Sequence, residues 1–290
     1  MLVLASGIEA AFVAHDFTVI IVAYVLMRVA IMAQWLRASR RADTSRRACL
    51  AYATGIGVAQ LLWLSLLVLP GWATTSAFVL FVAAELAVPV IAERRGLTPS
   101  HPHHITERYG LFTLILLGES LLASANAIIE ALHDEGALAP LLSLAALALI
   151  VTAALWWIYF WPPHHTTVTS LRSSFRYGYV HYLIFAAAGA FSAGVEVEVD
   201  VLSGHSELSE VAASFTVTVP IAIFVLGIWW IALRRHADRV VNAVVPAGAV
   251  LVLLDPVIPV PITLTALIMI AVVVVLVLRP PLVQERDGVE

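Results

Sequence analysis

The stretch from His101 to Asn126 joins a polar start to a long apolar helix that contains a carboxylate. It reads HPHHITERYGLFTLILLGESLLASAN. An ionised side chain at the centre of a bilayer costs on the order of 2.5 to 3.5 kcal/mol on insertion scales, so such residues usually face a bundle interior or a wet cavity. Glu119 is therefore the first candidate for proton or cation chemistry. The chain has no nucleotide-binding loop, catalytic-triad signature or zinc-type cysteine cluster.

The polar residues of this expected helix fall on two stripes. Each residue advances about 100° around a helix, so positions eleven or seven apart return to nearly the same face. Arg108, Glu119 and Asn126 have these spacings and share one stripe. A second polar stripe consists of Thr113, Ser120 and Ser124. We place Glu119, Ser120 and Asn126 on a path for a proton, ion or solute; the alternative is a packing face held by side-chain hydrogen bonds.

Two further charges lie deep in expected helices. At about 1.5 Å per residue, Arg28 and Glu85 fall within several ångströms of the midplane of a hydrocarbon core about 30 Å thick, as does Glu119. A buried arginine usually requires an acid, and two acids are available here. We expect Arg28 to pair with one of them, which leaves the other free to exchange a proton or bind a cation. The alternative is a static network of all three.

A polar cluster is expected where this path reaches the inner side of the membrane. Tyr177 and His181 lie in the inner half of a later helix, and a histidine there can relay protons or simply bond to a neighbour. We place them with His104, Glu107 and Arg108 at an inner mouth. The histidines nearby have no spacing that is diagnostic of a metal site, so we expect neither a metal nor a cofactor.

The composition indicates that most of the chain lies in lipid. Of its 290 residues 61% are hydrophobic and 12% are charged, and the mean hydropathy is +0.95. A soluble domain is nearer to about 45 to 50% apolar and about 25% charged. The lone Cys49 excludes an intrachain disulfide. We therefore expect an all-α fold, a polytopic transmembrane helix bundle that forms a single integral membrane domain over residues 1–290.

Apolar runs of about 20 residues, the length that spans a bilayer, divide this domain into about nine full helices and one partial N-terminal helix. The segments lie near 2–14, 17–36, 48–69, 73–92, 107–130, 138–160, 174–195, 211–233, 240–255 and 260–279. Every basic residue is an arginine, and the arginines outside the apolar runs fall in alternate connections. The positive-inside rule then predicts that both termini are cytoplasmic, in a bacterial cell membrane.

Three stretches resemble a known family. The run from His104 to Ser120 resembles the signature of the low temperature requirement protein A family of bacterial multi-pass membrane proteins. Trp156-Trp157-Ile-Tyr159-Phe160 and Tyr177-Gly-Tyr179-Val-His181 resemble it as well, in the same order along the chain. The family name records a growth phenotype, and the resemblance implies no reaction.

Two departures from the family pattern affect the expected site. Members usually begin with an acidic, aromatic-rich helix and a second helix, and neither is present here; the first segment resembles the tail of the family's third helix. Whether this shorter form reflects a misplaced start or a natural truncation is left open. In addition, Trp161 stands where the family pattern leads us to expect an acid.

We expect a transporter or channel for a small solute or ion, proton-linked, and favour this over an enzyme. The first alternative is a membrane-embedded enzyme that acts on a lipid or lipid-linked substrate at the inner leaflet, with the inner-mouth residues as acid–base groups. The second is a cold-adaptation scaffold without turnover. The expected partners are the lipid bilayer and a small solute or ion, a homo-oligomer is left open, and we expect no nucleic acid.

Overall fold

The computed structural model describes residues 17–41, 45–98, 101–133, 138–258 and 263–282. Within these ranges the chain is helical apart from its connections and contains no β-strand, which confirms the all-α fold class. The chain divides into two units, Met1–Ser100 (unit 1) and His101–Glu290 (unit 2). This division does not test the expected single membrane domain, which stays a prediction. The first expected segment, near 2–14, lies outside the described residues.

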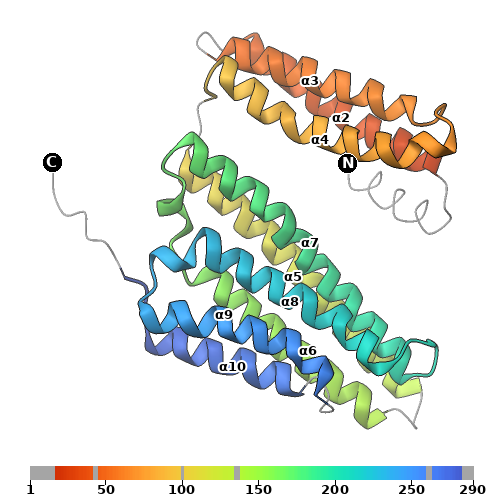
Figure 1. Cartoon of the computed structure of the whole chain (residues 1–290), viewed down its shortest axis with the longest axis vertical. Coiled ribbons are helices and arrows are strands. Elements are labelled where there is room, and N and C mark those ends of the chain that lie inside the picture. Colours follow the sequence, from red (N-terminus) through yellow and green to blue (C-terminus); the bar gives the residue numbers. More distant parts are fainter. Residues whose placement is uncertain (1–16, 42–44, 99–100, 134–137, 259–262, 283–290) are drawn as a thin grey trace. The chain divides into compact units, whose positions relative to one another are not determined.

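The described residues of unit 1 form three helices that pack along one another (Figure 1): α2 (Phe17–Ser39), α3 (Arg46–Ser65) and α4 (Gly71–Arg95). Small residues on α3 let its neighbours approach closely, as is common between membrane helices. A Cβ atom added at Gly55 would lie 2.8 Å from Cγ1 of Val88 on α4. The α3 backbone therefore lies directly against α4. Charged side chains inside such a unit are stable when they pair with one another.

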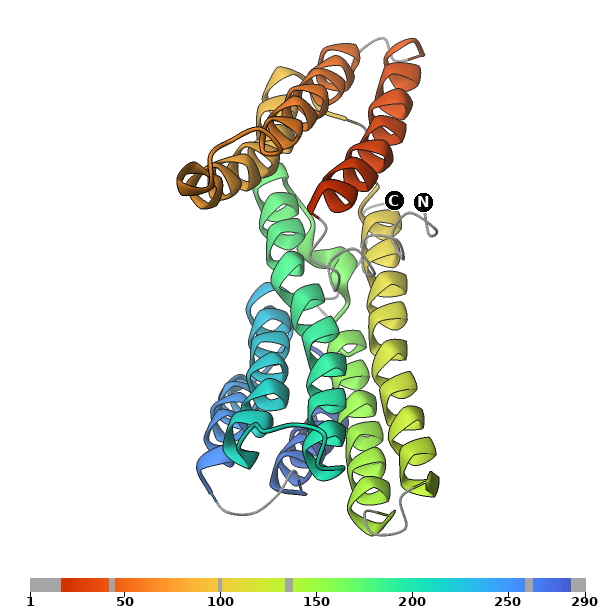
Figure 2. The same cartoon turned by 90° about the vertical axis from the view of Figure 1, so that its right-hand side faces the viewer.

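The described residues of unit 2 form six helices and three short 3₁₀ turns. They are α5 (Pro102–His133), α6 (Leu138–Phe160), η1 (His164–Thr167), α7 (Leu171–Leu202), α8 (Glu210–Ile231), η2 (Leu233–Arg235), α9 (Arg239–Leu254), η3 (Asp255–Val257) and α10 (Thr263–Leu278). Helix α8 packs on both α7 and α9, with Ile221, Phe224 and Ile228 fully buried. Helix α5 packs on α6 and α7, and Figure 2 shows it along one edge of the unit.

Among the described residues eight helices, α2 to α9, are long and apolar enough to cross a membrane when α9 is counted through η3 to Val257. Helix α10 is apolar but only 16 residues long. The expected segments agree with these helices, but α5 and α7 are longer than expected, with 32 residues each. The sequence estimate followed the apolar run, whereas the helices continue through polar residues such as Glu198 and Asp200. An apolar run marks the lipid-buried part of a helix and not its ends.

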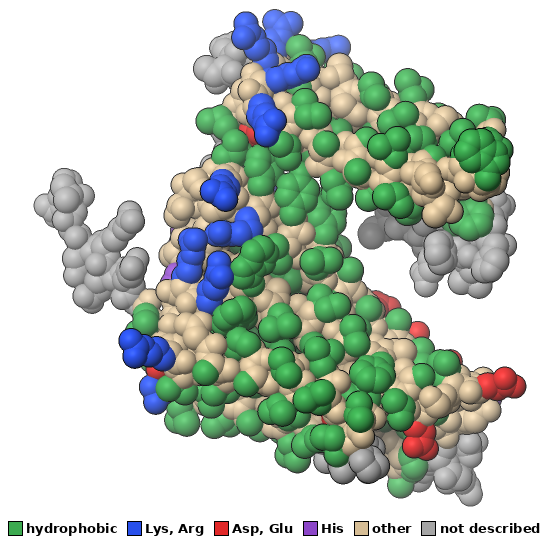
Figure 3. Space-filling view, in the orientation of Figure 1, with side chains coloured by type: hydrophobic (Ala, Val, Ile, Leu, Met, Phe, Trp, Pro, Cys, Tyr) green, Lys and Arg blue, Asp and Glu red, His purple; other side chains and the backbone are tan. Residues whose placement is uncertain are grey.

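The charges of unit 2 are segregated along its helices. Figure 3 shows arginine side chains gathered at one end of this unit and acidic side chains near the opposite end. Asymmetry of this kind is typical of membrane proteins, in which basic residues remain on the cytoplasmic side.

Candidate functional site

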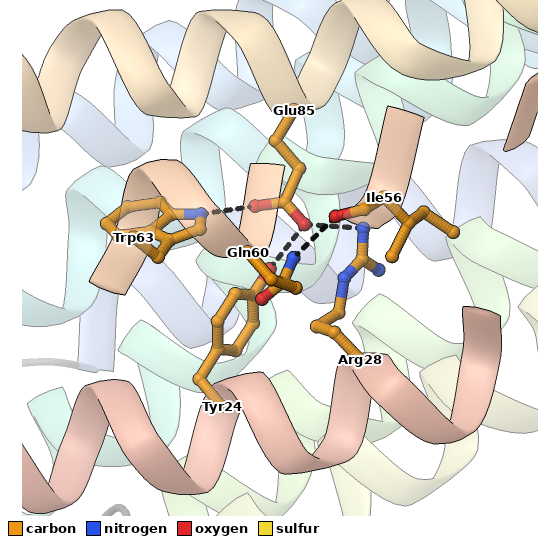
Figure 4. Close-up of polar contacts among 6 residues, drawn as sticks. All are labelled: Tyr24, Arg28, Ile56, Gln60, Trp63 and Glu85. Carbon is orange, nitrogen blue, oxygen red and sulfur yellow. Dashed lines mark hydrogen bonds and ion pairs between the residues drawn. The ribbon is translucent and has the colours of Figure 1, made fainter. Parts of the chain in front are cut away.

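Glu85 of α4 is the centre of a polar cluster inside unit 1 (Figure 4). The Tyr24 hydroxyl donates to Oε1 of Glu85 at 2.7 Å, and the Trp63 indole Nε1 donates to Oε2 at 2.7 Å. The Arg28 guanidinium forms an ion pair with Oε1. The carboxylate therefore joins donors from both other helices of the unit.

Local geometry explains why these donors converge. Tyr24 and Arg28 are four residues apart on α2 and share a helix face. The Trp63 ring is fixed by edge-to-face contacts with Phe78 and Phe81, at centroid distances of 5.4 and 6.0 Å. Pairing in the membrane interior offsets part of the desolvation cost of both charges. The expectation that Arg28 pairs with an acid is confirmed, and the acid is Glu85.

The cluster leaves one donor and one acceptor open. Arg28 Nε and Gln60 Oε1 are buried atoms that have no hydrogen-bond partner among the described residues. Gln60 is only 5% exposed. The amide nitrogen of Gln60 donates to the Ile56 carbonyl at 3.3 Å (Figure 4). A free donor and a free acceptor beside a partly buried ion pair suit a water molecule or a small polar solute.

Glu119 of α5 has a different environment. Its side chain is exposed at the surface of unit 2, together with Arg108 and Asn126 of the same stripe. It forms no hydrogen bond or ion pair with any residue that the structure describes. A Cβ atom added at the adjacent Gly118 would meet nothing within 4 Å. This carboxylate therefore faces away from the core of its own unit.

The second polar stripe of α5 points the other way. Thr113, Ser120 and Ser124 are buried. Ser120 shares a hydrogen bond with Thr152 of α6 at 3.0 Å. Its hydroxyl also lies 2.7 Å from the Leu117 carbonyl, one turn back along α5. This geometry matches the packing alternative for this stripe, and the structure does not bring Ser120 together with Glu119, although we had placed both on one path.

Two tyrosines and two histidines form a closed ring of hydrogen bonds inside unit 2. His181 Nδ1 lies 2.7 Å from the Tyr177 carbonyl, and His181 Nε2 lies 3.1 Å from the Tyr159 hydroxyl. His164 Nε2 lies 2.6 Å from the Tyr159 carbonyl, and His164 Nδ1 lies 3.0 Å from the Tyr177 hydroxyl. All four side chains are buried. The ring connects the end of α6, η1 and the start of α7.

The carbonyl acceptors assign the protons of this ring. A carbonyl only accepts, so His181 carries its proton on Nδ1 and His164 on Nε2. The other nitrogen of each neutral ring then accepts from a tyrosine hydroxyl. His164 lies in η1, in the connection between the spanning helices α6 and α7, and burial lowers its pKa to about 4. Both nitrogens of His181 are engaged, an arrangement that fits a bonded packing residue better than a proton relay.

The expected inner mouth thus separates into a buried part and an exposed part. Tyr177 and His181 belong to the buried ring, whereas His104, Glu107 and Arg108 are exposed on the first turns of α5. His104 Nδ1 lies 3.7 Å from Glu107 Oε2. A cavity of about 380 Å³ lies between these parts, and His103, Thr106, Glu107, Tyr159, His164 and His165 are among its lining residues.

Histidines around this cavity lie close together without forming a metal cluster. The rings of His103 and His165 stack, with centroids 4.1 Å apart and planes 18° apart. Repulsion between nearby imidazoles adds to burial in lowering the pKa of His165. In the part of the chain that the structure describes, no group of three or more His, Cys, Asp or Glu residues could hold a metal ion.

Several residues of these clusters were not among the expected site residues. Trp63 and Gln60 carry no charge and come from a helix that showed no polar stripe, so no sequence signal marked them. Tyr24 could have been found, because it lies one helical turn before Arg28. Tyr159 and His164 were not grouped with Tyr177 and His181, since their pairing depends on how α6 and α7 come together.

The comparison with protein families agrees with the residues noted in the sequence. Residues 1–278 match the model of the family described as Bacterial low temperature requirement A protein (LtrA). Neither the curated proteins nor the solved structures contain a significant match to the chain. The family match covers nearly the whole chain. The described helices of the chain are those of a multi-pass membrane protein. The chain therefore belongs to the bacterial low temperature requirement A (LtrA) family.

Proposed function

We propose that this protein moves a small solute or ion across the membrane in a proton-linked manner. The observation that carries the proposal is Glu119, a carboxylate without a partner among the described residues, exposed within the spanning helix α5. It lies roughly 25 Å from Pro102 and roughly 21 Å from His133 along the helix, near the middle of α5. A carboxylate at that depth is stable only if it faces water, a polar surface or a bound cation. Water or a bound cation at this depth is what a transport path would supply.

The apolar residues around Glu119 strengthen this reasoning. Ile115 and Leu122, one turn before and after it, are also exposed. A wholly lipid-facing stripe would have an apolar residue at position 119 as well, because replacing it with a charge there costs on the order of 2.5 to 3.5 kcal/mol. The charge therefore has a use that offsets this cost, and binding or exchanging a proton is the chemistry that a single carboxylate offers.

The Glu85 cluster forms a second polar site, and Glu85 lies at a similar depth in α4. The open Arg28 Nε and Gln60 Oε1 atoms can bind a water or the polar part of a solute. The ion pair with Arg28 and the hydrogen bonds from Tyr24 and Trp63 hold the Glu85 carboxylate in place at this second polar site. We assign it a positioning role and assign proton exchange to Glu119.

We further propose that the protein lies in the bacterial cytoplasmic membrane with both termini inside. The alternation of arginines among the connections and their gathering at one end of unit 2 (Figure 3) support this orientation.

The test is proton flux into liposomes that contain the purified protein, driven by an imposed pH gradient. Wild type is compared with Glu119→Gln and with Glu207→Gln, which removes a carboxylate from the connection before α8. The proposal predicts flux in wild type and in the control, and loss of flux in Glu119→Gln with the fold intact. Equal flux in all three proteins, or none in any of them, would exclude Glu119 as a transport residue.

One observation favours a second candidate, an enzyme that acts on a lipid or lipid-linked substrate at the inner leaflet. The cavity of about 380 Å³ is lined by His103, Glu107 and His165, which can supply acid–base groups. This candidate predicts a loss of function in His103→Gln or Glu107→Gln and indifference to Glu119→Gln. The transport proposal predicts the opposite pattern, so the same set of variants separates the two.

A further inference from the structure

Four arginines gather at the end of unit 2 where α7 begins and α8 ends. Arg172 and Arg176 belong to the first two turns of α7, and Arg234 and Arg235 to η2. The other three arginines all lie close enough to repel the charge of Arg176. None of the four is paired with an acid in the part of the chain that the structure describes. Figure 3 shows arginines clustered at this end of the unit.

This concentration of positive charge is unfavourable in the isolated protein. The first turn of α7 has no acidic residue, and the positive end of the helix dipole adds to the arginine charges there. The N-cap is already provided by Ser170, whose side chain accepts from the Ser173 amide. Topology alone requires arginines on this side of the membrane but does not require four of them to converge. An anion bound among them would remove the repulsion.

The surroundings indicate what carries that anion. Arg172, Arg176 and Leu183 are four and seven residues apart and continue along one face of α7, and Leu183 is 61% exposed. Trp230 of α8 is 42% exposed, and the Arg234 guanidinium of η2 lies over its ring, 5.8 Å from the ring centroid. The charged patch therefore borders exposed apolar surface on both helices, a pattern that matches a headgroup joined to an acyl chain.

We infer that Arg172, Arg176, Arg234 and Arg235 bind the phosphate of an anionic phospholipid, whose acyl chain lies along the exposed apolar faces of α7 and α8. Guanidinium groups match phosphate oxygens in geometry and charge. Basic pockets between transmembrane helices are known to take anionic headgroups, and each arginine near the surface contributes on the order of 1 kcal/mol. The site shares no residue with the Glu119 stripe or with the Glu85 cluster, and it does not depend on the transport proposal.

Native mass spectrometry of the protein in neutral detergent tests this site. The probes are dioleoyl phosphatidylglycerol, dioleoyl phosphatidylcholine and inorganic phosphate. The variants are Arg172→Gln/Arg176→Gln and, as a charge-matched control, Arg94→Gln/Arg95→Gln at the end of α4. The site predicts saturable binding of phosphatidylglycerol to wild type and control, and binding weaker by roughly 30-fold in the patch variant.

Each other result contradicts the inference. If wild type and the patch variant Arg172→Gln/Arg176→Gln bind phosphatidylglycerol equally well, the four arginines do not form the site. If the control variant Arg94→Gln/Arg95→Gln loses as much binding, the lipid responds only to diffuse surface charge. Phosphate that binds as tightly as the lipid makes it a site for a free anion. Thermal melting in the same detergent checks the fold: the patch variant should melt no lower than wild type without lipid, because repulsion is relieved, and should gain less stability from phosphatidylglycerol. The single variant Arg176→Gln repeats the test if the double variant does not fold.

Discussion

Glu85 and Glu119 are two carboxylates at similar depth in spanning helices, and they differ in what surrounds them. Glu85 accepts from Tyr24 and Trp63 and pairs with Arg28, and its side chain is only 13% exposed. Glu119 is exposed and has no partner among the described residues. The depth of a charge in a membrane helix therefore does not reveal its role. A satisfied carboxylate holds helices together, whereas an unsatisfied one is available to a proton, a cation or a solute.

The largest expected effect is the loss of one partner of the ion pair in unit 1. Glu85→Gln leaves Arg28, whose side chain is only 23% exposed, without a counter-charge inside the membrane, which costs about 3 to 5 kcal/mol. We expect a sharp fall in folded yield and melting temperature, measured by size-exclusion chromatography of heated samples. The double variant Arg28→Gln/Glu85→Gln should recover most of this loss. If the single variant is as stable as the double variant, Glu85 is not held as described.

The next effect is a pH dependence of stability that comes from His164. Its folded-state pKa is lowered from 6.5 to about 4 by burial, so below about pH 6.5 the unfolded chain binds a proton that the folded chain excludes. Stability should fall by about 3 kcal/mol as the pH drops from about 6.5 to about 4. His164→Gln keeps a donor and an acceptor without titrating and should flatten this part of the curve, whereas His205→Gln in an exposed connection should not. Parallel curves for wild type and His164→Gln would contradict the buried neutral histidine.

A smaller loss is expected from breaking the buried ring at one hydroxyl. Tyr159→Phe leaves His181 Nε2 without its donor, which costs about 1 to 3 kcal/mol. Tyr182→Phe, on an exposed side chain of α7, is the matched control and should change stability little. Thermal melting of both variants measures the difference. A loss in Tyr182→Phe as large as that in Tyr159→Phe would show that the ring is not a stabilising unit.

The smallest stability effect should come from Glu119→Gln, and this sharpens the contrast with Glu85. Because Glu119 contacts no described polar partner, the free energy of unfolding should change by less than about 0.5 kcal/mol. The same variant should lose proton flux. A destabilisation comparable to that of Glu85→Gln would assign Glu119 to packing instead.

The sequence allowed the fold and the depth of the charges to be predicted, but not the partners. Apolar runs and arginine spacing identified the helices from α2 to α10, because both follow from the cost of placing polar groups in lipid. The i, i+11 spacing placed Arg108 and Glu119 on one face correctly. The choice of Glu85 as the partner of Arg28 depends on how α2, α3 and α4 pack. A one-dimensional pattern does not contain that information.

The same limit explains why Ser120 lies apart from Glu119 and why the ring was missed. Ser120 follows Glu119 in sequence, but one helical step of about 100° turns it toward Thr152 and the core. Tyr159 and His164 meet Tyr177 and His181 only because η1 folds back beside α7. Contacts between distant segments follow from tertiary packing, which residue types and spacing in one sequence do not specify.

Labelling with dicyclohexylcarbodiimide, a hydrophobic reagent that attacks protonated carboxyl groups, tests the contrast between the two carboxylates most directly. The protein is labelled in liposomes, and the modified residues are mapped by mass spectrometry. Our account predicts modification of Glu119, protection of Glu85 by its two hydrogen-bond donors and its ion pair with Arg28, and loss of flux in proportion to the labelling of Glu119. Labelling of Glu85 with Glu119 unmodified would contradict it, because the paired carboxylate would then be the one that exchanges protons.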